Sequence, residues 1–133
     1  MFKTVLFPID MSPEAQHAAS TVRELVQLHQ SRLILLSVVE VAEEGSSTRQ
    51  ASAEAVASLL AEVKAMFADH GIDSEVLERE GQPAFVICDV ADEFEADLIV
   101  MGCRGIGLLE DASAESVTNR VINLAPCPVL VVP

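Results

Sequence analysis

Residues 97–107 combine a buried-strand pattern with a glycine turn that could bind an anion. Four apolar residues, 98–101, run directly into a segment that has three glycines between positions 102 and 107. Glycine permits positive φ angles and lets another group approach the backbone closely. A helical pattern begins near Ser116, so a strand, a glycine turn and a helix N-terminus follow in order, and backbone N–H groups gather at such a junction. The residues themselves allow either an anion site or a tight connection that binds nothing.

The glycine turn matches none of the common nucleotide or catalytic motifs. No Gly-Lys-Ser/Thr follows it, and its order, GxxGxG after the fourth expected strand, differs from the dinucleotide-binding order after a first strand. The chain also lacks a GxSxG or HExxH segment, and its three histidines are scattered over expected helices. Cys103 in the turn is either a reactive thiol or a small residue in a small space. We therefore expect no enzyme activity.

Hydrophobic periodicity divides the chain into alternating strands and helices. Period-2 or wholly apolar runs predict strands, and apolar residues every three to four positions predict helices. The long second helix should bury Ala57, Leu60 and Phe67 among others, and Gly71 should end it. A surface loop is expected between Glu40 and about Ser52. The expected strands are 4–9, 32–39, 72–80, 98–101 and 128–133, and the expected helices are 13–29, 49–70, one that opens at Pro83, and 115–124.

This alternation predicts a single α/β domain over residues 1–133, built on a five-stranded, doubly wound parallel sheet. Ligands of such sheets bind at the carboxyl ends of the strands, where the strand order reverses. Asp10 follows the first strand and Gly102 follows the fourth. We therefore expect these two positions to meet in one crevice.

Composition limits the classes of partner. The net charge is −13 with a pI near 4.4, which argues against nucleic acid or an anionic membrane surface. Hydrophobic residues make up 50% of the chain, but no apolar run reaches the roughly 18 residues that span a bilayer. The three cysteines, an odd number without metal-like spacing, fit free thiols in a reducing compartment. A cytoplasmic location is therefore expected.

Four segments together resemble the universal stress protein (UspA-like) family over the whole length of the chain. They are residues 5–12, 81–84, 96–105 and 125–132. The resemblance implies an adenine nucleotide alpha hydrolase-like fold, homodimers and a role in stress response. In one branch of the family it also implies ATP bound in the crevice, through the motif Gly-x2-Gly-x9-Gly-Ser/Thr.

The resemblance also implies which residues would bind the nucleotide. Asp10 would lie near the ribose and Val39 near adenine. The phosphates would be held by Gly102, Gly105, Ser116 and Val117. The predicted set is completed by Pro8, Ile9, Met101 and Arg104.

Glu115 departs from this motif, because it stands where the third glycine would be. Its side chain adds bulk and negative charge at the helix N-terminus, and Glu110 and Asp111 add more charge nearby. Two like charges about 5 Å apart repel by about 1 kcal/mol even in water. An acid in the first helical turn also suits the helix dipole, so Glu115 could itself occupy the anion site. Weak ATP binding and a dimeric interaction module without ATP therefore both stay open.

The last strand is expected to form a homodimer interface. Residues 129–132 are wholly apolar, no helix follows them, and a five-stranded sheet places them at an edge. Exposed apolar edges invite pairing, so a second copy should cover residues 128–132 by antiparallel pairing across a two-fold axis.

Overall fold

The structure, a computed structural model, describes residues 2–9, 13–39, 48–102 and 117–133. The predicted positions Asp10, Arg104, Gly105 and Ser116 lie outside the described residues, as do Cys103, Glu110, Asp111 and Glu115. The elements run β1 (Thr4–Pro8), α1 (Pro13–His29), β2 (Arg32–Val39), α2 (Thr48–Asp69), β3 (Ser74–Glu80), α3 (Pro83–Glu93), β4 (Leu98–Gly102), α4 (Val117–Leu124) and β5 (Val129–Val132).

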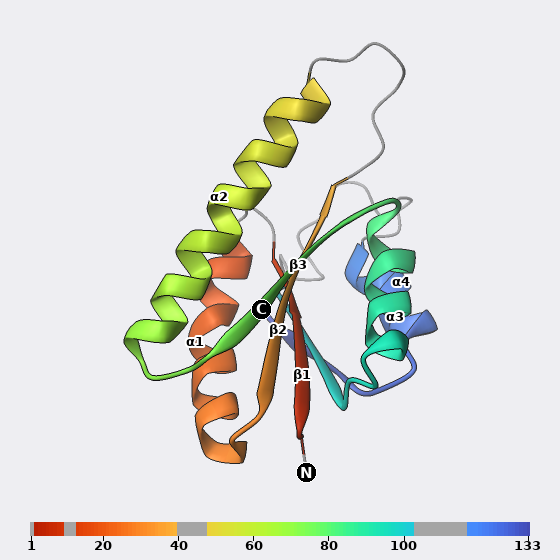
Figure 1. Cartoon of the computed structure of the whole chain (residues 1–133). Helices are drawn as coiled ribbons and strands as arrows, with labels where there is room; N and C mark the ends of the chain where they lie inside the picture. The colour runs from red at the N-terminus through yellow and green to blue at the C-terminus, as the bar shows by residue number, and fades with distance from the viewer. Residues whose placement is uncertain (1, 10–12, 40–47, 103–116) are drawn as a thin grey trace.

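The strands form one parallel sheet in the order β3-β2-β1-β4-β5, which confirms the predicted fold class. β1 is central, the apolar strand β5 lies at one edge as expected, and the charged strand β3 lies at the other. Helices α1 and α2 cover one face, and α3 and α4 cover the other (Figure 1). This arrangement is a doubly wound three-layer sandwich.

The two cores follow from the alternation of side chains along each central strand. Val5 and Phe7 of β1 point into the core beneath α1 and α2, whereas Leu6 between them points into the core beneath α3 and α4. The same alternation divides β2 and β4. A parallel strand that is covered on both faces has no solvent side, and this explains the unbroken apolar runs in the sequence.

Some predicted boundaries and faces differ from the structure. The third strand begins at Ser74 instead of Ile72. The chain turns at Gly71, which has φ +77°, and it enters the sheet only after this turn is complete. In α2, Leu59 is buried and Ala57 is exposed. Leu59 lies three residues after Val56 and four before Val63, so it shares their face of the helix, whereas Ala57 falls at its margin.

Candidate functional site

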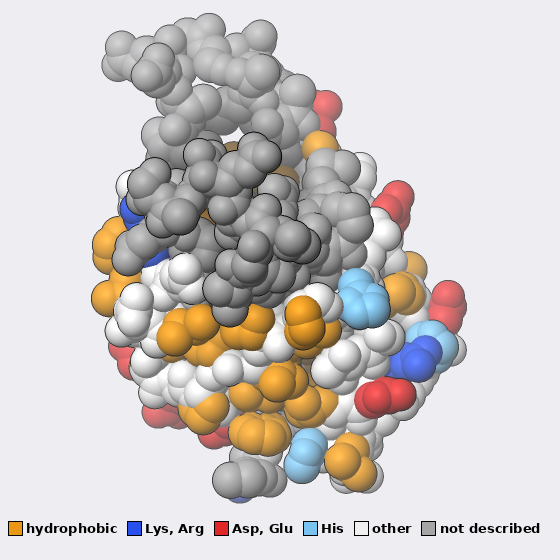
Figure 2. Space-filling view, turned by 180° about the vertical axis from the view of Figure 1, so that it is seen from behind, with side chains coloured by type: hydrophobic (Ala, Val, Ile, Leu, Met, Phe, Trp, Pro, Cys, Tyr) orange, Lys and Arg blue, Asp and Glu red, His pale blue; other side chains and the backbone are white. Residues whose placement is uncertain are grey.

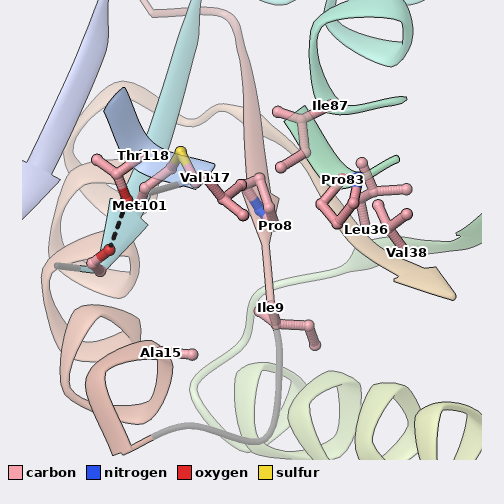
Figure 3. A pocket seen from close by; sticks show the side chains of 11 residues that line it. Pro8, Ile9, Ala15, Leu36, Val38, Pro83, Ile87, Met101, Val117 and Thr118 are labelled. Atoms are coloured by element: carbon pink, nitrogen blue, oxygen red, sulfur yellow. Dashed lines mark hydrogen bonds between the residues drawn. The ribbon is translucent and has the colours of Figure 1, made fainter. Parts of the chain in front are cut away.

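A pocket of about 310 Å³ opens at the carboxyl ends of the central strands (Figure 3). The chain leaves β1 toward α1 on one face of the sheet, and it returns from β4 through α4 on the other face. Side chains at this reversal point therefore surround a space that none of the described helices and strands fills. Ile9, directly after β1, lines the pocket, the strands contribute Pro8, Leu36, Val38, Met101 and Gly102, and the helices contribute Ala15, Pro83, Ile87, Val117 and Thr118.

The structure brings together five of the residues that the sequence nominated. Pro8 and Ile9 at the end of β1 face the same pocket as Met101 and Gly102 at the end of β4, with Val117 from the start of α4. β1 and β4 are direct neighbours, with Val5 opposite Leu98 and Leu6 opposite Ile99, so their ends meet. A pocket is therefore present between the ends of the first and fourth strands, whereas the expected meeting of Asp10 with Gly102 lies outside the described residues.

Val39 does not line this pocket, although the sequence nominated it. Its side chain is buried, and its carbonyl oxygen accepts a hydrogen bond of 3.0 Å from the Gly81 amide. The preceding residue, Val38, lines the pocket instead. Neighbouring side chains of a strand point to opposite faces, so a shift of one residue changes which side chain is available to a ligand.

Sequence reasoning missed further lining residues on β2 and α3. Leu36 and Ile87 gave only a core signal, because a buried strand or helix residue looks the same whether or not it borders a cavity. Pro83 was recognised only as the first residue of α3. The Gly81–Gln82–Pro83–Ala84 junction was the available signal, since it places the N-terminus of α3 beside the ends of β1 and β2.

The described wall of the pocket is apolar apart from one side chain. The Thr118 hydroxyl donates a long hydrogen bond of 3.4 Å to the Gly102 carbonyl oxygen, and this bond links the first turn of α4 to the end of β4. None of the described lining residues carries an ionisable side chain. This part of the pocket is therefore suited to hold an apolar ring by contact.

The described part of the chain contains neither a metal-binding cluster nor a membrane-spanning helix. Among those residues, no three or more His, Cys, Asp or Glu side chains are placed to hold a metal ion together. In the same residues, no helix has the length and apolar character that crossing a membrane requires.

Comparison with known proteins gives a consistent result over the full chain. The model of the universal stress protein family matches residues 1–133. A universal stress protein of Synechocystis is 60% identical, and the alignment covers 100% of this chain and 87% of that protein. Among solved structures, UspA from Lactobacillus plantarum superposes with a TM-score of 0.85 at 26% identity, covering 99% of this chain and 98% of that one.

Two other structures with this fold contain adenine nucleotides. One is a universal stress protein in complex with cAMP, with a TM-score of 0.82 and 20% identity, covering 99% of this chain and 97% of that one. The other, from Archaeoglobus fulgidus in complex with dAMP, has a TM-score of 0.76 and 19% identity, covering 99% and 98%. At identities of 20% and 19%, the similarity to these two structures shows a shared fold and nothing beyond it.

Proposed function

Because the chain belongs to the universal stress protein family, we propose that it is a non-catalytic stress-response regulator that binds an adenine nucleotide, with ATP as the first candidate. The observation that carries this proposal is the apolar pocket at the ends of β1 and β4. Ligand pockets of doubly wound sheets lie at this point, and the volume of about 310 Å³ is within the range of small-molecule sites.

The two ends of the pocket suit the two ends of a nucleotide. Leu36, Val38, Pro83 and Ile87 gather on one side of the pocket (Figure 3), and there they would contact the purine ring. Met101, Val117 and Thr118 lie on the other side, next to Gly102. Backbone N–H groups at a strand end and a helix N-terminus suit phosphate, so the phosphates would point that way.

Binding should be weak. Glu110, Asp111 and Glu115 belong to the segment that joins Gly102 to Val117 in the sequence, and the whole chain carries a net charge of −13. Carboxylates near a triphosphate raise the free energy of the complex through like-charge repulsion. This acidity is also the observation that favours the second candidate function, a dimeric interaction module that does not hold ATP.

The proposed active assembly is a homodimer joined through β5. All four residues of β5 are half-buried in the single chain, and this strand occupies one edge of the sheet. In Figure 1 the sheet is viewed from the side of β3, so the reverse view in Figure 2 faces the β5 side. Hydrophobic side chains gather in the centre of that view, while Asp and Glu side chains lie toward its margins. A second copy would cover this apolar surface.

Calorimetric titration with ATP and Mg²⁺ tests the nucleotide proposal on three proteins. The wild type should bind, and Val38→Phe should weaken binding at least tenfold, because the larger ring fills the space proposed for the purine. Val76→Phe is the matched control, since Val76 is a 40% exposed residue of β3 that does not line the pocket. Absence of wild-type binding at millimolar ATP would favour the interaction module instead.

A further inference from the structure

A second pocket, of about 340 Å³, lies on the other face of the sheet between α1 and α2. It exists because the two helices diverge over the central strand: α1 packs mainly on β4 and β5, whereas α2 packs on β2 and β3. Phe7 of β1 and Ile9, the residue directly after β1, form its floor. Among the described lining residues, Ile9 and Ala15 are the two that line both this pocket and the first one.

Most of the side chains that line this second pocket are apolar, and aromatic packing holds its floor in place. The Phe7 ring packs edge-on against Phe67, with ring centroids 6.4 Å apart and an interplanar angle of 89°. α1 contributes the small side chain of Ala19, and α2 contributes Leu59 and Val63. A floor fixed by aromatic packing changes little on binding, so a ligand would not have to order it.

The polar groups of the second pocket identify the class of ligand. Gln16 of α1 and Glu62 of α2 are its only polar side chains among the described lining residues, and both are exposed. Glu62 is therefore the one formal charge on that lining. Met66, 37% exposed, adds a flexible apolar side chain of the kind that adapts to different ligands. An apolar body with a cationic head complements both features.

We propose that this α1–α2 pocket binds small apolar amines, with the hydrocarbon part over Phe7 and the ammonium group beside the Glu62 carboxylate. This site rests on its own lining residues and stands whether or not the first pocket binds a nucleotide. The ion pair between the ammonium group and Glu62 would be exposed to solvent. The charge should therefore make an amine bind only two- to fivefold more tightly than a neutral analogue, with most of the affinity coming from apolar contact.

Two methionines provide a separate reporter for each pocket. Met66 lines the α1–α2 pocket and Met101 lines the pocket at the ends of β1 and β4. In protein labelled with ¹³C at the methionine methyl groups, 4-propylbenzylamine should shift the Met66 signal saturably with a Kd on the order of 1 mM, as expected for so small a ligand. The Met101 signal should move less. The neutral 4-propylbenzyl alcohol should bind two- to fivefold more weakly than the amine.

Three variants complete the test. Glu62→Gln should make the amine and the alcohol bind equally, whereas Glu54→Gln, which removes an exposed carboxylate elsewhere on α2, should leave the preference intact. Val63→Phe should abolish binding of the amine and of the alcohol, because the larger side chain fills the pocket. If the Val63→Phe protein does not fold, the two glutamate variants test the proposal without it. The proposal is overturned if 10 mM amine gives no saturable Met66 shift, if Met101 responds more strongly, or if Glu62→Gln keeps the preference.

Discussion

Asp97 and Thr4 are joined by two hydrogen bonds, although they lie 93 positions apart in the sequence. The Thr4 amide donates to Asp97 Oδ2 at 2.9 Å, and the Asp97 amide donates to the Thr4 carbonyl oxygen at 2.8 Å. The same Oδ2 atom also accepts from the Lys3 amide at 3.1 Å. These bonds fix the start of β4 against the start of β1, so they set the register of the two strands whose far ends form the first pocket.

Replacing Asp97 should therefore destabilise the fold. Asp97→Ala removes the acceptor and leaves the partly buried Thr4 amide unsatisfied, which should lower the free energy of unfolding by about 2 kcal/mol. Urea unfolding measures the change. Asp89→Ala is the control, because Asp89 is an exposed residue of α3 and should change stability by less than about 0.5 kcal/mol. Equal losses of unfolding free energy in the two variants would contradict a stabilising role for the hydrogen bonds of Asp97.

The nucleotide affinity should depend on Glu115. If this carboxylate opposes the phosphates, Glu115→Gly should tighten ATP binding at least tenfold, equivalent to about 1.4 kcal/mol. Glu115→Gln separates charge from bulk, because it removes only the charge. Calorimetry on these variants and on Glu54→Gln, a charge removal distant in sequence, checks the effect. Tight wild-type binding that neither Glu115 variant improves would rule out this role.

The fold was largely predictable from the sequence because its strands are buried on both faces. Runs such as Leu33–Leu36 give a strong local signal, and the regular alternation of strands and helices along the chain leaves few topologies. Even the opposite characters of the two edge strands, charged in β3 and apolar in β5, follow directly from the printed sequence.

The lining of the site was less predictable, since it depends on which residues of different elements border the same space. Val38 and Val39 are identical in type, and only the pleat of β2 against α3 decides that Val38 lines the pocket. Thr118 and Gly102, which form a hydrogen bond, lie 16 positions apart in the sequence, and no sequence pattern predicts this contact. The second pocket has no motif at all, because it results from the divergence of two helices.

The cysteines should differ in reactivity. Burial raises the pKa of the Cys88 thiol, and the nearby Asp89 carboxylate raises it further. Burial likewise raises the pKa of Cys127, with smaller contributions from Asp97 and Cys88. A raised thiol pKa means less thiolate at pH 7, so both should alkylate slowly and accelerate only as the pH rises above the usual thiol range.

Cys103 provides the comparison. If the glycine turn gathers N–H groups that favour an anion, a thiolate there is favoured too, and Cys103 should alkylate faster than the other two at pH 7. Mass spectrometry after iodoacetamide labelling gives the three rates. A ranking that places Cys103 last would count against the anion-receptive turn and so against the proposed phosphate position.

The β5 edge has a main-chain pattern that identifies which residues would pair with a second copy. The Ile99 amide donates to the Pro128 carbonyl oxygen at 3.0 Å, so Pro128 directs its carbonyl toward β4. Alternate residues of a strand direct their main-chain groups to the same side, so Leu130 and Val132 also face β4. Val129 and Val131 consequently direct theirs to the outer edge, where an antiparallel copy would meet them.

Proline at these two kinds of position should have different effects. Val131→Pro removes an outward N–H, so it should dissociate the homodimer while the subunit stays folded. Leu130→Pro removes an N–H that serves the pairing with β4, and it should lower the stability of the subunit itself. Light scattering at micromolar concentration gives the mass, and circular dichroism reports the fold. A wild type that is a folded monomer, or a Val131→Pro protein that remains a dimer, would show that the β5 edge is not the interface.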